Sequence, residues 1–197
     1  MKYCSHCAAA VELRVPAGDN RERHVCTRCG SVFYQNPKIV AGCIAEHDGK
    51  LLLCRRAIEP RYGLWTLPAG FMENQETAIE AAVRETREEA NAGVDIIDLF
   101  TLFSLPHADQ VYMMFRSRVL DLGEAPGSES LEVGLFDEAQ VPWDEIAFAT
   151  ILHTLRFYIS DRRAGRFQLH VGDIVKNGAA SSFVPRRENP LSHSLPL

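Results

Sequence analysis

The sequence predicts an α+β protein made of two units, a small N-terminal module held by four cysteines and a larger domain of strands and two helices. Three observations lead to this prediction. Two Cys-x-x-Cys pairs stand near the N-terminus, strand-like runs and two helical patterns follow, and one of the helices carries a row of glutamates. A chain of 197 residues is long enough for one core of ordinary size and a small stapled module.

The composition describes a globular protein and argues against several classes of function. Hydrophobic residues make up 46% of the chain and charged residues 24%, which is typical of a soluble domain with a buried core. The net charge of −5 argues against general binding to nucleic acids or anionic membranes. No apolar run approaches the ~20 residues of a membrane span, and no leader pattern is present, so we expect a cytoplasmic protein.

The N-terminal cysteines have the spacing of a four-cysteine zinc site. Cys4-Ser-His-Cys7 and Cys26-Thr-Arg-Cys29 are separated by 18 residues. Disulfides are disfavoured in a reducing cytosol, and a redox-active Cys-x-x-Cys would be expected near a βαβ pattern, which the sequence lacks. We therefore predict structural Zn²⁺ bound by these four thiolates. The remaining thiols and imidazoles of interest are expected not to bind it: His6, His24, Cys43 and Cys54.

Apolar runs after the cysteine module predict a sheet. Residues 38–46 and 50–56 are rich in β-forming side chains and flank Asp48-Gly49, a favourable hairpin turn. Further strands are expected at residues 99–105, 111–120 and 130–136.

A second helical pattern and a polar tail complete the chain. Residues 143–163 repeat apolar side chains near the helical period, and Gly165 follows the pattern. The tail from Lys176 is rich in Ser, Pro, Asn and Gly and is expected to be mobile. We therefore divide the chain into a ribbon at residues 1–33, a domain at 34–175 whose first four residues form a hinge, and a tail at 176–197.

The most informative segment is residues 70–92, which read as a glycine turn followed by an acidic helix. Glu85, Glu88 and Glu89 stand at i, i+3 and i+4 and share one helix face. Like charges at this spacing repel by roughly 0.2–0.5 kcal/mol per pair, and the last turns of a helix prefer cations. A face with this cost is a candidate site for hard divalent metal ions. The alternative is a solvated acidic face tempered by Arg84 and Arg87.

The remaining positions of this segment predict how the helix packs. Asn74 is a plausible N-cap, and Gly70 allows the tight turn that leads into the helix. Apolar and small side chains recur at helical spacing and are expected to cover a sheet: Ala78, Ile79, Ala82, Val83, Thr86 and Ala90.

The same segment resembles the signature of the Nudix hydrolases, G-x5-E-x7-R-E-U-x-E-E-x-G-U. Gly70, Glu76, Arg84-Glu85 and Glu88-Glu89 match it at the required spacing. The two departures, Thr86 and Asn91, replace no carboxylate. Asn also tolerates the left-handed conformation that a helix C′ residue needs. The resemblance implies an α/β/α sandwich as the fold.

The resemblance also implies roles for individual residues. Mg²⁺ or Mn²⁺ would be held by the three helix glutamates and by the carbonyl of Ala69, which precedes the glycine. Arg84 would orient the first catalytic glutamate, with Glu76 as its ion-pair partner. Late in the domain, Glu132 matches another metal-binding glutamate, and Glu129 is the alternative if the register slips. Whether Glu88 or Glu132 is the general base stays open.

A wider resemblance indicates the substrate. A zinc ribbon before a Nudix domain resembles the NADH pyrophosphatases, but their S-Q-P-W-P-F-P-x-S motif is replaced by FSLPHADQ at residues 103–110. The segments YQNPKIVAGCI, LLLCRRAIEPRYGLWTLPAGFME, APGSESLEVGLF and LHVGDI resemble the ribbon-bearing ADP-ribose/FAD pyrophosphatases of plant chloroplasts and bacterial relatives. This resemblance implies metal-dependent hydrolysis of the diphosphate of ADP-ribose or FAD into two monophosphates.

Substrate contacts are expected from several residues outside the signature. Two come from the resemblance, a hinge tyrosine at Tyr34 and a backbone contact to the base at Ala147. The others are side chains that can stack on adenine or pair with phosphate, although aromatic residues near a strand end are more often part of the core: Arg55, Arg56, Trp65 and Phe71.

Other classes of function remain as alternatives. The chain could be a nucleic-acid-binding ribbon with a degenerate catalytic domain, or a regulator that senses ADP-ribose without turnover. The intact carboxylate set argues against both alternatives. Among enzymes, the second candidate is an NADH or NAD-capped RNA pyrophosphatase. We expect a dinucleotide as the small-molecule partner, no nucleic acid and no membrane, and the resemblance allows a homodimer.

Overall fold

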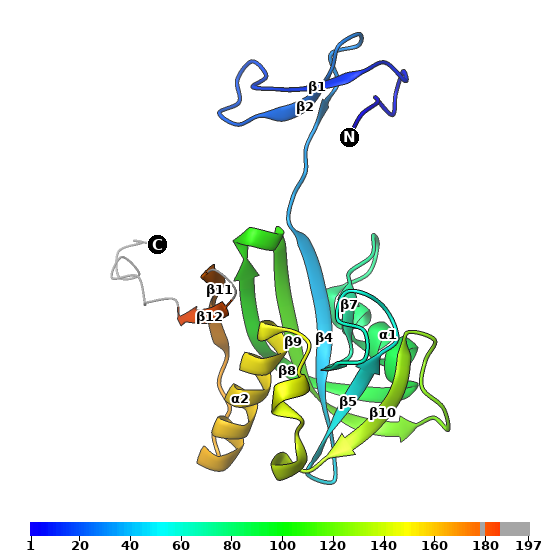
Figure 1. Ribbon diagram of the computed structural model, residues 1–197, viewed down its shortest axis with the longest axis vertical. Helices are drawn as coiled ribbons and strands as arrows, with labels where there is room; N and C mark the ends of the chain where they lie inside the picture. Colours follow the sequence, from blue (N-terminus) through cyan, green and yellow to red (C-terminus); the bar gives the residue numbers. More distant parts are fainter. Residues whose placement is uncertain (178–179, 186–197) are drawn as a thin grey trace, which may run out of the picture. The chain divides into compact units, whose positions relative to one another are not determined.

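The computed structural model describes residues 1–177 and 180–185 and divides the chain into two compact units, Met1–Pro37 and Lys38–Leu197 (Figure 1). The segment that the sequence suggested as a hinge, residues 34–37, belongs to the first unit. Within the described residues, no helix is both long and apolar enough to cross a membrane.

The N-terminal unit is a three-stranded antiparallel sheet with almost no apolar core. Its strands β1 (Val11–Arg14), β2 (Arg23–Cys26) and β3 (Val32–Phe33) pair in that order. The buried apolar side chains of the unit are Cys4, Val25 and Cys26. A unit this small cannot be stabilised by hydrophobic burial alone, so it needs a staple such as a metal ion.

The larger unit is built on a mixed nine-stranded sheet. The strand order is β10-β5-β4-β9-β8-β11-β12, with β6 paired to β5 and β7 paired to β4. The β4–β9 and β8–β11 pairs are parallel. The strand bounds are β4 Lys38–His47, β5 Lys50–Arg56, β6 Trp65–Thr66, β7 Ala69–Phe71, β8 Ala92–Leu105, β9 Gln110–Leu122, β10 Ser130–Phe136, β11 His170–Asn177 and β12 Ala180–Pro185.

Alternating side chains of the central strands bury both faces of this sheet. On β5, Leu52 and Cys54 join the core under helix α1 (Ala78–Ala90), whereas Leu51 and Leu53 join the core under helix α2 (Ala149–Ala164). Because successive strand residues point to opposite faces, the two helices cover opposite sides of the sheet. The predicted α/β/α sandwich is therefore confirmed (Figure 1).

Three local predictions, one about a hairpin turn and two about helix ends, are confirmed. The β4–β5 hairpin turns at Asp48-Gly49, where both residues have positive φ. Asn91 ends α1 in the left-handed conformation, with φ of 50°, and its N–H donates to the carbonyl of Arg87. Gly165 ends α2 in the same way.

The predicted start and apolar face of α1 need correction. Thr77, not Asn74, is the N-cap, because Thr77 and Glu80 form a capping box with reciprocal hydrogen bonds. Ile79 is 49% exposed, whereas Ala81 and Glu89 are buried. The helix therefore buries a carboxylate that the apolar pattern placed outside the core.

The second helix begins six residues later than predicted. Residues Trp143–Glu145 form a separate 3-10 turn, and α2 starts at Ala149. Between them, Ile146 forms a parallel bridge with Trp65, and the N–H of Ala147 donates to the Trp65 carbonyl. This extended pairing interrupts the helix.

The tail also differs in part from the prediction. Lys176 lies in β11, and β12 pairs with β11 along residues 180–185. The rest of the predicted mobile tail, residues 178–179 and 186–197, lies outside the described residues. Strands β8 and β9 are longer than expected because β8 follows α1 directly and pairs with β9 along most of its length.

Candidate active site

An arginine on α1 binds three carboxylates at once. The Arg84 guanidinium donates to both oxygens of Glu76 at 2.8 and 3.0 Å, to Glu85 at 2.7 Å and to Glu88 at 2.9 Å. It also donates to the carbonyl of Phe71. This pairing lowers the pKa of Glu76 to about 2 and fixes the direction of the other two carboxylates.

The turn before the helix brings backbone close to these carboxylates. A Cβ on Gly70 would overlap the carboxylate of Glu85, so a side chain there would force that carboxylate to move. The N–H of Ala69 donates to Glu89 at 3.2 Å. The β7 turn and the helix are therefore held together by the acidic residues themselves.

Two of the helix carboxylates are partly or wholly withdrawn from water. Glu89 is only 6% exposed, and burial raises its pKa to about 8, with the neighbouring Glu85 adding to the shift. Burial also raises the pKa of Glu85, against the opposing effect of Arg84. Buried carboxylates with raised pKa values are typical of functional sites.

A fourth carboxylate reaches the same region from the loop before β10. Glu129 lines the cavity with Glu85, Glu88 and Glu89, and its charge raises the pKa of both Glu85 and Glu89. Its carbonyl accepts a hydrogen bond from the N–H of Ala57 at 2.8 Å. Glu129 was the alternative in the sequence-based assignment.

These carboxylates form one wall of a cavity of about 1140 Å³. The other walls come from β7, the loop after β5, the turn between β8 and β9, the start of α2, and strands β11 and β12. A cavity of this size accommodates a dinucleotide. A cavity lined by both acidic and basic side chains suits a phosphorylated ligand bound through cations.

The structure brings some of the remaining predicted residues to this cavity. Phe71 lines it and is 47% exposed, with the Lys38 ammonium 4.7 Å from its ring centre. Arg56 lines it, with its guanidinium 5.1 Å from the ring centre of Phe148. Ala69 and Ala147 also line it, although the N–H of Ala147 already donates to Trp65.

Three other predicted residues of the larger unit, Glu132, Arg55 and Trp65, are not brought to the cavity wall. Glu132 points to Arg55 across the β10–β5 pair, with 3.7 Å between the charged atoms, and neither lines the cavity. Trp65 is 7% exposed and packs edge-on against Phe136, so it is a core residue. Tyr34 lies in the N-terminal unit, 5.0 Å from the Arg23 guanidinium.

Several cavity residues were not anticipated from the sequence. They come from several loops, from β9, from the start of α2 and from β11, and they are Glu59, Arg61, Glu73, His107, Tyr112, Phe148, Thr150 and Lys176. Only His107 carried a signal, because it stands in the stretch that replaces the NADH-pyrophosphatase motif.

Comparison with known proteins identifies the family. Residues 36–158 match the family model of the NUDIX domain, and residues 2–35 match the zinc-ribbon model described as Nudix N-terminal. The chain is a Nudix hydrolase. A NUDIX hydrolase from Nitrosomonas europaea, known from a crystal structure, is 53% identical and covers 89% of this chain and 100% of its own, with a TM-score of 0.86.

Two curated relatives carry names of activities. An ADP-ribose pyrophosphatase from Methanocaldococcus jannaschii is 32% identical over 114 residues, which are 56% of this chain and 68% of that protein. The NAD-capped RNA hydrolase NudC of Chromobacterium violaceum is 31% identical over 166 residues, which are 82% of this chain and 59% of that protein. The matches confirm a pyrophosphohydrolase with a ribbon, and this Nudix hydrolase spans little more than half the length of the NudC relative.

The four cysteines of the zinc ribbon form the expected cluster. Their sulfur atoms all lie within 4.8 Å of one another, with Cys4–Cys29 at 3.7 Å and Cys7–Cys26 at 3.5 Å. A tetrahedral Zn²⁺ with Zn–S bonds of ~2.3 Å places its sulfurs ~3.8 Å apart, whereas a disulfide needs ~2.05 Å. The cluster therefore fits a metal ion. His6 and His24 bond instead to Ser31 and the N-terminal amine.

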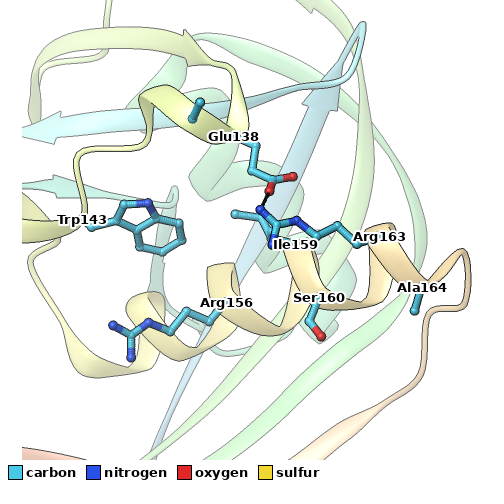
Figure 2. Close-up of a pocket in the computed structure, with 8 residues that line it drawn as sticks. Glu138, Trp143, Arg156, Ile159, Ser160, Arg163 and Ala164 are labelled. Atoms are coloured by element: carbon cyan, nitrogen blue, oxygen red, sulfur yellow. Dashed lines mark ion pairs between the residues drawn. The ribbon is translucent and has the colours of Figure 1, made fainter.

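The Nudix hydrolase has a second cavity, of about 780 Å³, beside α2 (Figure 2). Figure 2 shows Trp143 and Arg156 on one side of it and Glu138 paired with Arg163 on the other. Glu138 also pairs with Arg162 at 3.1 Å. The single carboxylate that lines this second cavity is therefore already neutralised by two arginines, so the cavity lacks the ligand set of a metal-dependent active site.

Proposed function

We propose that this Nudix hydrolase cleaves the diphosphate of ADP-ribose or FAD into two monophosphates, using Mg²⁺ or Mn²⁺. The observation that carries the proposal is the gathering of four carboxylates, Glu85, Glu88, Glu89 and Glu129, on one dinucleotide-sized cavity. The mutual repulsion of these carboxylates and the burial of two of them disfavour their charged forms. Cations would remove this cost.

The donor set fits hard divalent ions. Carboxylate and carbonyl oxygens are the ligands that Mg²⁺ and Mn²⁺ prefer, and Glu85, Glu88, Glu89 and Ala69 carry such oxygens along one cavity. When bound, such an ion neutralises the diphosphate and lowers the pKa of a coordinated water.

The surrounding residues position this chemistry. Arg84 holds Glu85 and Glu88 in fixed directions, so little reorganisation is needed when the substrate binds. Arg56 offers a guanidinium to the phosphate oxygens from another part of the wall. For the general base, the placement favours Glu88 or Glu129 over Glu132, which faces Arg55.

The loop between β8 and β9 and one of the relatives support a preference for ADP-ribose or FAD over NADH. That loop contains Pro106 and His107 where NADH pyrophosphatases carry their own motif, and His107 lines the cavity. A site that lacks groups placed for nicotinamide ribose discriminates against it. The relative named as an ADP-ribose pyrophosphatase supports the same preference.

An NADH or NAD-capped RNA pyrophosphatase is the second candidate. It is favoured by the NudC relative, whose similarity covers 82% of this chain, more than the NUDIX domain alone.

Comparing kcat/KM for ADP-ribose, FAD and NADH at one pH and one metal concentration tests the proposal. We expect ADP-ribose or FAD to be cleaved best, with AMP and ribose phosphate or FMN as products. A tenfold preference for NADH, worth about 1.4 kcal/mol of transition-state binding, would favour the second candidate instead. The cytoplasmic location and the homodimer stay predictions.

A further inference from the structure

The loop that carries Glu129 is fastened to the C-terminal end of α1. Three hydrogen bonds connect the two: Gly123 N–H to the carbonyl of Asn91 at 2.8 Å, Asn91 Nδ2 to the carbonyl of Ala125 at 3.1 Å, and Gly127 N–H to the carbonyl of Glu89 at 3.1 Å. The first and third use the backbone carbonyls of Asn91 and Glu89. Only the bond to Ala125 depends on which side chain stands at position 91.

Two glycines in this loop allow it to approach the C-terminal end of α1 closely. A Cβ on Gly127 would overlap the carbonyl of Glu88, and a Cβ on Gly123 would overlap the side chain of Asn91. The loop therefore approaches backbone to backbone against the same helical turn that carries Glu88 and Glu89. Such close docking transmits the position of one element to the other.

The docked loop continues directly into Glu129. The N–H of Ser130 donates to the carbonyl of Gly127 at 3.0 Å, and the Glu129 carbonyl accepts from Ala57. Glu129 is thus held by α1 on one side, through Gly127, and by the segment after β5 on the other. A change in the docking at Asn91 moves the loop that aims the carboxylate.

We propose that Asn91 is a positioning residue, whose amide sets the distance of Glu129 from the helix carboxylates by anchoring the loop at Ala125. The proposal rests on the proposed function of Glu129 in the metal-dependent reaction. It explains why position 91 carries a hydrogen-bonding side chain where glycine would end the helix equally well. A purely structural Asn91 would affect stability and leave the reaction unchanged.

Asn91→Gly separates the two roles, because glycine keeps the left-handed cap and removes only the amide. We expect thermal stability to be unchanged, kcat to fall about 10-fold as for other supporting contacts, and KM to change little. Combined with Glu129→Gln, the substitution should cause no further loss, since both would act through one carboxylate.

Asp121→Asn is the matched control. Asp121 at the end of β9 pairs with Arg87 on the same turn of α1, at 2.7 Å, and both are about half exposed, whereas the Ala125 carbonyl accepts from Asn91. Breaking this exposed pair should leave kcat unchanged. A wild-type kcat in Asn91→Gly would overturn the proposal, and so would a loss that adds in full to that of Glu129→Gln.

Hydrogen–deuterium exchange of residues 123–130 provides a readout that does not need turnover. We expect faster exchange of this segment in Asn91→Gly and wild-type exchange in Asp121→Asn. Unchanged exchange in Asn91→Gly refutes the anchor even if the enzyme is active. If the wild-type protein cleaves no dinucleotide, the proposed function fails, while the exchange data still decide whether Asn91 holds the loop.

Discussion

The two candidate metal sites of this Nudix hydrolase relate to the fold in opposite ways. In the zinc ribbon, four thiols replace a core, since the unit buries almost no other apolar side chain. In the hydrolase domain, a complete core surrounds a cavity whose carboxylates repel one another and lose hydration. Zn²⁺ would therefore stabilise the N-terminal unit, whereas a divalent ion in the cavity would relieve the repulsion between carboxylates that the folded domain already contains.

The largest effect should come from removing a carboxylate of the cavity. Glu85→Gln keeps an oxygen that can accept from Arg84, so the fold should stay intact, while turnover falls about 100-fold or more because a charged metal ligand is lost. Glu88→Gln should behave in the same way. Circular dichroism and steady-state kinetics at saturating Mg²⁺ measure both. Near wild-type rates would refute the metal-ligand role.

Removal of a thiolate from the zinc ribbon should instead destabilise the N-terminal unit. Cys4→Ser or Cys29→Ser should abolish binding of one zinc per chain and unfold the N-terminal unit, because its folding depends on the metal. The hydrolase domain should keep its own unfolding transition. Elemental analysis and calorimetry test this. A zinc-free protein with an intact ribbon, or one with disulfides, would contradict it.

The pH dependence of stability should reveal the buried carboxylate. The pKa of Glu89 is raised to about 8 in the folded protein from an ordinary value of 4.5. Between these values the unfolded chain has released the proton and the folded chain retains it, so this group lowers stability as pH rises. Glu76, whose pKa is lowered, loses its contribution only in acid.

Metal ions should therefore raise Tm more at pH 8 than at pH 6, because at lower pH they must displace a proton from Glu89. Thermal unfolding with and without Mg²⁺ at both pH values measures the difference. An equal Tm increase at the two values would indicate that Glu89 binds no metal.

The smallest effect concerns a hydroxyl at the cavity wall. Thr150 Oγ1 has no hydrogen-bond partner among the described residues. The Tyr112 hydroxyl lies close enough for Thr150 to lower the pKa of Tyr112, but the two groups do not have hydrogen-bonding geometry. Thr150→Val should therefore raise Tm by about 2–4 °C. Thr154→Val, one turn further on, should lower it by a similar amount because Thr154 bonds to Thr101 at 3.3 Å. A lower Tm for Thr150→Val would contradict this.

Sequence reasoning succeeded where the determinants are local. The cysteine spacing, the hairpin at Asp48-Gly49 and the cap at Asn91 each depend on a few adjacent residues, and the structure confirms them. The glutamate spacing on α1 likewise places three carboxylates on one cavity.

Sequence reasoning was incomplete where a distant segment decides the conformation, and it named Glu129 only as an alternative to Glu132. Glu129 reaches the cavity because Gly127 docks on α1, and the two segments are nearly 40 residues apart in sequence. Trp65 is buried by Phe136, and the bridge between Trp65 and Ile146 delays the start of α2. No periodicity within a short window carries this information.

Glu89→Gln tests the central claim, that the cavity keeps a destabilising carboxylate for metal-dependent hydrolysis. Glutamine resembles the protonated acid and can still accept from Ala69, so at pH 8 without metal the variant should have a higher Tm than the wild type. The Mg²⁺-induced rise in Tm should disappear, and turnover should fall about 100-fold or more. A lower metal-free Tm together with wild-type turnover would contradict the account.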